Sequence, residues 1–184
     1  MRIAKNLRGD QENISRFLAA LGGASVVLSA SKHARPSFFI LAHDFIQEYI
    51  EAGFFRKEEV LIKVLEDGGF SPDEGPIHAI RDDQKKCRDA AEILISAAQR
   101  WQAGDEEMRP EVGWATSVYT GAIRQHMERL KNHIFPLLEQ TISMDEEHKV
   151  SEEVNAIVFE GGLKAGPAKY VKLIETLEEE LSDW

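Results

Sequence analysis

Residues 124–136 read "RQHMERLKNHIFP" and carry two histidines, His126 and His133, within a stretch of helical periodicity. Rotation by about 100° per residue places Ile123 and Leu130 on the same side of this helix as His126, and His133 falls on that side too. Both histidines are therefore predicted to face the interior of a helical protein. They are either metal ligands or polar residues held in a core, and most functional inference depends on which of the two is true.

The bulk composition favours one compact domain. The chain has 184 residues, of which 43% are hydrophobic, and a formal net charge of −10. This charge would repel phosphates, so we expect no nucleic-acid partner. No run of about 18 apolar residues is present, so we expect no membrane-spanning helix and no membrane partner. The N-terminus becomes polar too early for a signal peptide, so a cytoplasmic location is the default expectation.

The pattern is helical nearly throughout, and clusters of Gly and Pro separate the helices. The first helix is predicted to begin near Asp10, and it either stops at Gly22 and Gly23 or continues to about Ser31. Three more long helices are predicted over residues 36–67, 76–101 and 112–142.

Four long helices joined by short loops favour an all-α fold, an antiparallel up-down four-helix bundle. This bundle is predicted to occupy residues 1–145. Residues 146–184 are predicted to form two shorter helices. These helices either pack on the bundle or form an interface, with a second copy of the chain in a homodimer or with a protein partner.

Helical rotation places a few polar side chains on inward faces. Glu58 lies at the edge of an apolar line on the second helix, whereas Glu59 is turned outward. Burying a polar group is costly unless it is paired, so a core that collects such groups can hold a ligand. The inward set contains one residue from each long helix: Gln11, Glu58, Gln84 and His126.

The stretch "IRQHMERLKNHIFPLLE" resembles the last helix of the hemerythrin-like, HHE cation-binding proteins. In that family a ligand histidine is followed by Leu-Phe-Pro at the distance that separates His126 from Ile134, Phe135 and Pro136 here. "LRGDQENISRFLAAL", "FFRKEEVLIKVLEDGG" and "GPIHAIRDDQKKCRDA" resemble the family's first, second and third helices. The resemblance implies a hemerythrin-like four-helix bundle that holds two non-haem iron ions and carries or senses oxygen, stores or senses iron, or responds to redox signals.

The family's ligand pattern matches this chain at only a few positions. By the resemblance, His126 matches a ligand histidine and Glu58 a ligand or bridging carboxylate. Non-haem iron usually needs three or more imidazole and carboxylate donors, so the two that remain do not predict a normal di-iron centre. Histidines of the first three helices and a glutamate of the last are replaced, in chain order, by Gln11, Phe54, Gln84 and Leu130.

The first hypothesis is a binding, sensory or scaffold protein whose di-iron site is degenerate and which holds no cofactor. In it, Glu58 and His126 form a buried pair, closed by Gln84 and Gln11, and Arg88 supplies positive charge where a metal would. Phe54 and Leu130 then fill the remaining space.

The second hypothesis is a protein that binds iron or another cation through an altered, mononuclear ligand set and acts in oxygen or iron sensing or storage. It uses Glu58, His126 and a third donor. His133 cannot be that donor, because it lies about 10 Å from His126 along the helix axis. A haem bound from one side by His126 or His133 is a further option, against which the narrow interior of a bundle argues.

No enzyme activity is predicted, because the sequence lacks a Gly-rich phosphate loop, a nucleophile elbow and a Ser/His/Asp arrangement. Cys87 is predicted to be a buried, inert thiol, and the lone cysteine excludes an internal disulfide framework. Asp82 and Asp83 are interpreted as solvated charges.

Overall fold

The structure is a computed structural model that describes residues 1–160 and 166–184, and every regular element in these ranges is a helix. The all-α prediction is therefore confirmed. Residues 161–165 belong to the predicted C-terminal extension and lie outside the described residues. No helix in the described ranges is long and apolar enough to cross a membrane.

The first helix, α1 (Arg2–Val27), begins well before the predicted start near Asp10. Ile3, Ala4 and Leu7 are buried along one face, so the helical periodicity extends almost to the N-terminus. The helix also passes through Gly22 and Gly23 without interruption. A side chain at Gly23 would come within 3.2 Å of Leu181, which shows how closely the last helix approaches α1 there.

The second long helical segment follows the predicted residues 36–67 but is not a plain α-helix. It consists of α2 (Pro36–Phe45), the π-helix η1 (Ile46–Phe55) and α3 (Arg56–Asp67). A π-helical turn contains more residues than an α-helical turn and frequently lies at functional sites. Gly53, Phe54 and Phe55 at the end of η1 are all buried.

The remaining long segments agree with the predicted ranges to within a few residues, and Pro76 and Pro110 lie at their first turns. The third segment is one helix, whereas the fourth contains a short π-helix. A 3₁₀ turn precedes the fourth, and two shorter helices follow it. In chain order the elements are α4 (Gly75–Gln102), η2 (Glu106–Met108), α5 (Arg109–Arg129), η3 (Leu130–Ile134), α6 (Phe135–Thr141), α7 (Met144–Glu160) and α8 (Pro167–Ser182).

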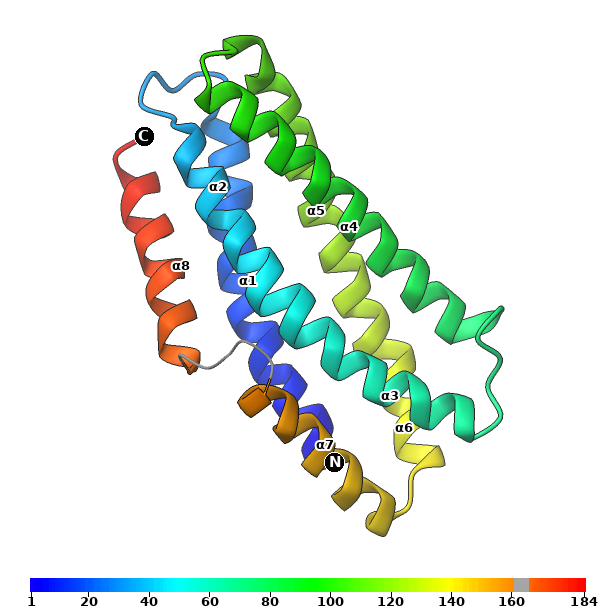
Figure 1. Ribbon diagram of the computed structural model, residues 1–184. Coiled ribbons are helices and arrows are strands. Elements are labelled where there is room, and N and C mark those ends of the chain that lie inside the picture. The colour runs from blue at the N-terminus through cyan, green and yellow to red at the C-terminus, as the bar shows by residue number, and fades with distance from the viewer. Residues whose placement is uncertain (161–165) are drawn as a thin grey trace.

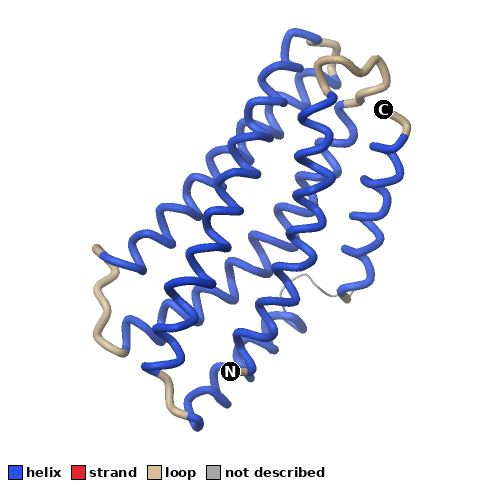
Figure 2. The backbone as a smooth tube through the Cα atoms, turned by 180° about the vertical axis from the view of Figure 1, so that it is seen from behind, coloured by secondary structure: helices blue, strands red, loops and turns tan. Residues whose placement is uncertain are grey.

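The long segments lie alongside one another (Figure 1), and short loops join them at their ends (Figure 2). α4 packs against α5 and α2, and α1 packs against α5. α7 contacts α3 and α1 near the N-terminus, whereas α8 lies along α1 and α2. The Trp184 ring, just after α8, lies 4.8 Å from that of Phe38 between centroids.

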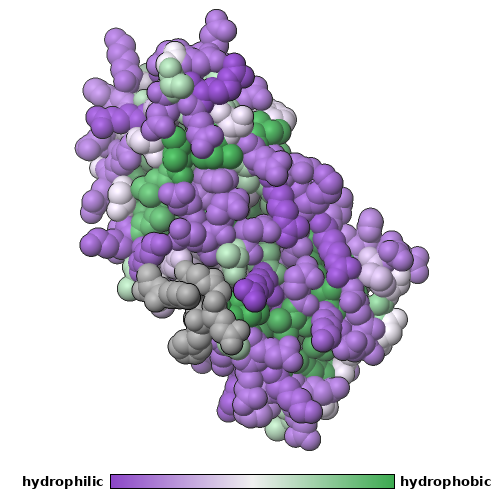
Figure 3. All heavy atoms as spheres, in the orientation of Figure 1, coloured by the Kyte–Doolittle hydropathy of each residue, from purple (hydrophilic) through white to green (hydrophobic). Residues whose placement is uncertain are grey.

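Apolar side chains fill the interior between the long segments, and hydrophilic residues dominate the face shown in Figure 3. Because a buried polar group needs a partner, the few polar residues inside this interior are the candidates for a functional site. Among the residues whose burial the structure describes, the buried polar ones are Lys57, Glu58, Asp83, Gln84, Thr116, Thr120 and His126.

Candidate functional site

Glu58 of α3, Gln84 of α4 and His126 of α5 meet in the interior, and none of them is more than 1% exposed. His126 Nε2 lies 2.7 and 2.8 Å from the two carboxylate oxygens of Glu58. Gln84 Nε2 donates a hydrogen bond to Glu58 Oε2 at 2.8 Å. Glu59 is exposed, as the rotation predicts. Three of the four inward polar residues predicted from the sequence are therefore in contact.

The other side of the His126 ring faces Asp83. His126 Nδ1 lies 3.7 Å from Asp83 Oδ2, too far for a hydrogen bond, so the attraction is that of two charges. Arg129 Nε donates a hydrogen bond to the same Asp83 oxygen at 2.7 Å. The Arg129 side chain is 29% exposed and that of Asp83 3%. Glu58, Gln84, His126, Asp83 and Arg129 thus form a buried ionic network that reaches from the core to the surface.

The electrostatics of this network favour a charged histidine. Burial lowers the pKa of His126, but the carboxylates of Glu58 and Asp83 outweigh burial and raise the pKa to about 9. Burial raises the pKa of Asp83, yet the contacts with His126 and Arg129 outweigh it and lower that pKa. At neutral pH His126 is therefore an imidazolium, and acidic and basic side chains alternate along the network.

Asp83 and Arg129 were not predicted as site residues, and the interpretation of Asp83 as a solvated charge is wrong. Asp83 is 2% exposed. It lies three residues after Ile80 and four before Cys87, both buried, and residues at these spacings share one side of a helix. The spacing was therefore a usable signal for burial of Asp83, whereas its partner Arg129 is revealed only by the packing of α4 on α5.

Gln11 and Arg88 do not join the network. Gln11 is half-buried, and its amide reaches the Met127 carbonyl oxygen only at 3.5 Å. Arg88 instead donates a hydrogen bond from Nε to Glu51 Oε1 at 2.6 Å. Its side chain is 46% exposed, because the long side chain extends past the core face to the edge of α4. The positive charge expected from Arg88 comes from His126 itself and from Arg129.

His133 is exposed, so the prediction that it faces the core is wrong. His133 lies within the π-helix η3, which contains more residues per turn than an α-helix, so the inward position moves on to Ile134. Phe54 and Leu130 are each 1% exposed. The Phe54 ring meets the His126 imidazole edge-on, with 6.4 Å between centroids. Apolar groups thus occupy this part of the interior.

The donor set does not fit a di-iron centre. Glu58 and His126 Nε2 point at one place, but Asp83 faces the opposite ring nitrogen and cannot bind the same ion as Nε2. Phe54 and Leu130 offer no donor atoms. Across residues 1–160 and 166–184 as described, no three His, Cys, Asp or Glu side chains converge as metal ligands would.

A second buried charge, Lys57 of α3, is paired with α1. Its ammonium group donates to Asp10 Oδ2 at 2.6 Å and to Asn6 Oδ1 at 3.1 Å. Tyr49 OH donates to the other Asp10 oxygen at 3.0 Å. Burial and the Asp10 charge raise the pKa of Tyr49. Because the side chains of Lys57, Asp10 and Tyr49 all have hydrogen-bond partners, this cluster stabilises the packing of α1 against the second segment.

No protein-family model, no characterised protein and no solved structure matches this chain significantly.

Proposed function

We propose that the four long segments form a hemerythrin-like, antiparallel up-down four-helix bundle whose metal position has been taken over by an ionic network. In this proposal the protein is a binding, sensory or scaffold protein and not a metal-dependent one. The four segments, the position of Glu58 and His126 on the second and fourth of them, and the sequence resemblance support it.

One observation carries the proposal: both carboxylate oxygens of Glu58 lie within 2.8 Å of His126 Nε2. This pairing consumes the donor atoms that an iron ion would need. It also supplies the charge compensation that a buried carboxylate requires, because the imidazolium replaces the cation. Gln84 donates a further hydrogen bond to the carboxylate, and buried polar groups in a core without metal need such partners.

A metal-loading experiment tests the proposal. The purified protein is incubated anaerobically with Fe(II), desalted, analysed for metal by mass spectrometry, and then exposed to air while its absorption spectrum is recorded. We expect neither stoichiometric iron nor a new visible band. Stoichiometric iron that disappears in both Glu58→Gln and His126→Ala variants would refute the proposal.

The second candidate is a mononuclear cation site, and one observation favours it. Glu58 and His126 already face each other across the interior at 2.7 Å, so small side-chain shifts would open a position for an ion bound by both. Such an ion needs a further donor, for which Gln84 is the neighbour within reach. Iron retained at one ion per chain would select this candidate over the first.

A further inference from the structure

A cavity opens between the second segment, α4 and α5, and the Phe55 ring separates it from His126 of the buried ionic network. It measures about 160 Å³. A cavity of about 150 Å³ is known to hold a molecule the size of benzene, so this one has room for about six non-hydrogen atoms. Ile46, Phe55 and Ala91 form apolar walls, whereas polar groups lie at the mouth and on the floor.

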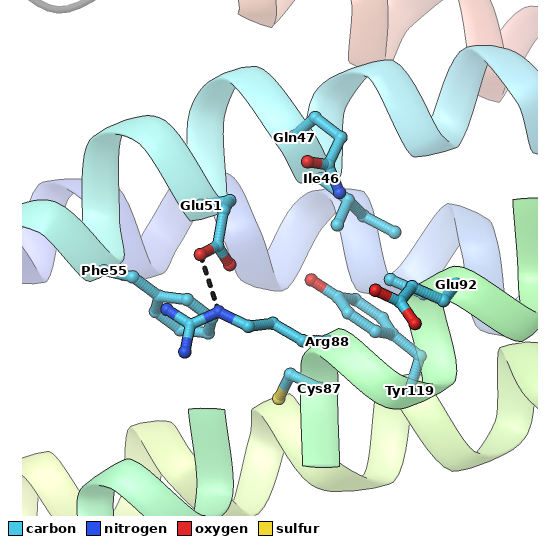
Figure 4. A pocket seen from close by; sticks show the side chains of 9 residues that line it. Ile46, Gln47, Glu51, Phe55, Cys87, Arg88, Glu92 and Tyr119 are labelled. Carbon is cyan, nitrogen blue, oxygen red and sulfur yellow. Dashed lines mark hydrogen bonds and ion pairs between the residues drawn. The ribbon is translucent and has the colours of Figure 1, made fainter. Parts of the chain in front are cut away.

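Tyr119 of α5 supplies the polar group of the floor. It is 1% exposed. In the described parts of the chain no side chain or backbone group forms a hydrogen bond with its hydroxyl. Figure 4 shows this hydroxyl directed into the cavity, toward the side where Ile46 and Glu51 lie. A buried hydroxyl without a protein partner is costly, so its position in a cavity points to a molecule that satisfies it.

The charges around the mouth indicate what kind of molecule fits. Two carboxylates, from Glu51 and Glu92, line the cavity together with the single guanidinium of Arg88. Arg88 is already engaged, because its Nε donates to Glu51 and its guanidinium lies over the Phe55 ring at 5.7 Å. The surplus charge is negative, which favours a cation over an anion.

We propose that this cavity binds a small organic cation: a short primary amine with a hydroxyl group. Its ammonium lies between the carboxylates of Glu51 and Glu92, its carbon atoms contact Ile46 and Phe55, and its oxygen exchanges a hydrogen bond with Tyr119. The inference goes beyond the function proposed above and does not depend on whether the interior ever held a metal.

Titration of the full-length protein with 2-aminoethanol, followed by backbone amide NMR shifts, tests the proposal. Neutral 1-propanol and anionic propionate are the matched probes of similar size. We expect saturable shifts around the cavity with the amine and much weaker responses with the other two. Propionate or propanol binding as tightly as the amine would overturn the assignment, as would shifts that never saturate.

Two variants and two controls locate the binding. Tyr119→Phe removes one hydrogen bond and is expected to weaken amine binding about fivefold, and Glu92→Gln, which removes a charged partner, about tenfold or more. Tyr49→Phe and Glu59→Gln make the same chemical changes away from the cavity and should leave the affinity unchanged.

Glu92 is exposed, so its variant should fold even if the Tyr119 variant does not. Unchanged affinity in folded Glu92→Gln protein would refute the proposal.

Discussion

Replacement of His126 by alanine should destabilise the protein in a pH-dependent way. The pKa of His126 rises from the ordinary 6.5 to about 9 in the folded protein. Each unit of that pKa difference corresponds to about 1.4 kcal/mol, so the charged histidine contributes about 3 kcal/mol to the free energy of unfolding. Removing one partner of a buried ion pair costs about 3–5 kcal/mol by comparison with other proteins, which agrees in size.

The sign of the pH dependence follows from the direction of the shift. A group with a raised pKa in the folded state stabilises it fully below the unfolded pKa, and this contribution is lost as the pH rises through the folded pKa. The cost of His126→Ala should therefore be largest near pH 6 and decline toward pH 10.

Urea denaturation followed by circular dichroism at several pH values, in the presence of a chelator, measures this cost. The wild-type protein at each pH is the reference, so titrating groups that do not contact His126 cancel. A cost below about 1 kcal/mol at pH 6, or one that grows between pH 7 and pH 10, would show that His126 is not held as a buried imidazolium.

Three further outcomes are expected. The double variant Glu58→Leu with His126→Leu should have a stability within about 1–2 kcal/mol of wild type, because apolar residues often replace a buried ion pair at little cost. Urea denaturation measures this stability. A loss as large as the sum of the losses in the two single variants would contradict the prediction. Lys57→Met should cost about 2–3 kcal/mol, whereas Arg81→Met, which removes only exposed ion pairs, should cost under about 1 kcal/mol in the same assay. Cys87 is 1% exposed, and burial raises its pKa to about 12. A thiol reagent at pH 8 should therefore label Cys87 only after the protein unfolds. Rapid labelling of the native protein would contradict this prediction.

Helical periodicity predicted the parts of the site that lie on regular α-helices. A rotation of about 100° per residue placed Glu58, Gln84 and His126 inward, and all three are buried together. The same rotation placed His133 inward as well, and it failed there because His133 lies within a π-helix, whose rotation per residue is smaller. Side-chain polarity also misled, since Asp83 was interpreted as solvated although its spacing from buried neighbours places it on the core side.

Other details could not be predicted because they depend on the distance between helices. The packing of α4 against its neighbours decides that Arg129 contacts Asp83 and that Arg88 contacts Glu51. A single helix read by itself contains no information on such distances. The early start of α1 was different, because the spacing of Ile3 and Leu7 was visible in the sequence.

The π-helix η1 gives the second segment a tolerance to length changes that an uninterrupted α-helix such as α4 lacks. A turn closed by bonds between residues five apart contains one residue more than an α-helical turn of the same reach. Deleting one residue within Ile46–Phe55 would let the backbone tighten into an α-helix while the flanking helices keep their orientation. The same deletion in the middle of α4 would turn all later side chains by about 100° and move buried residues of its later half toward water. Length variation in this protein is thus expected to concentrate in the π-helices, above all in η1, a few residues before Glu58.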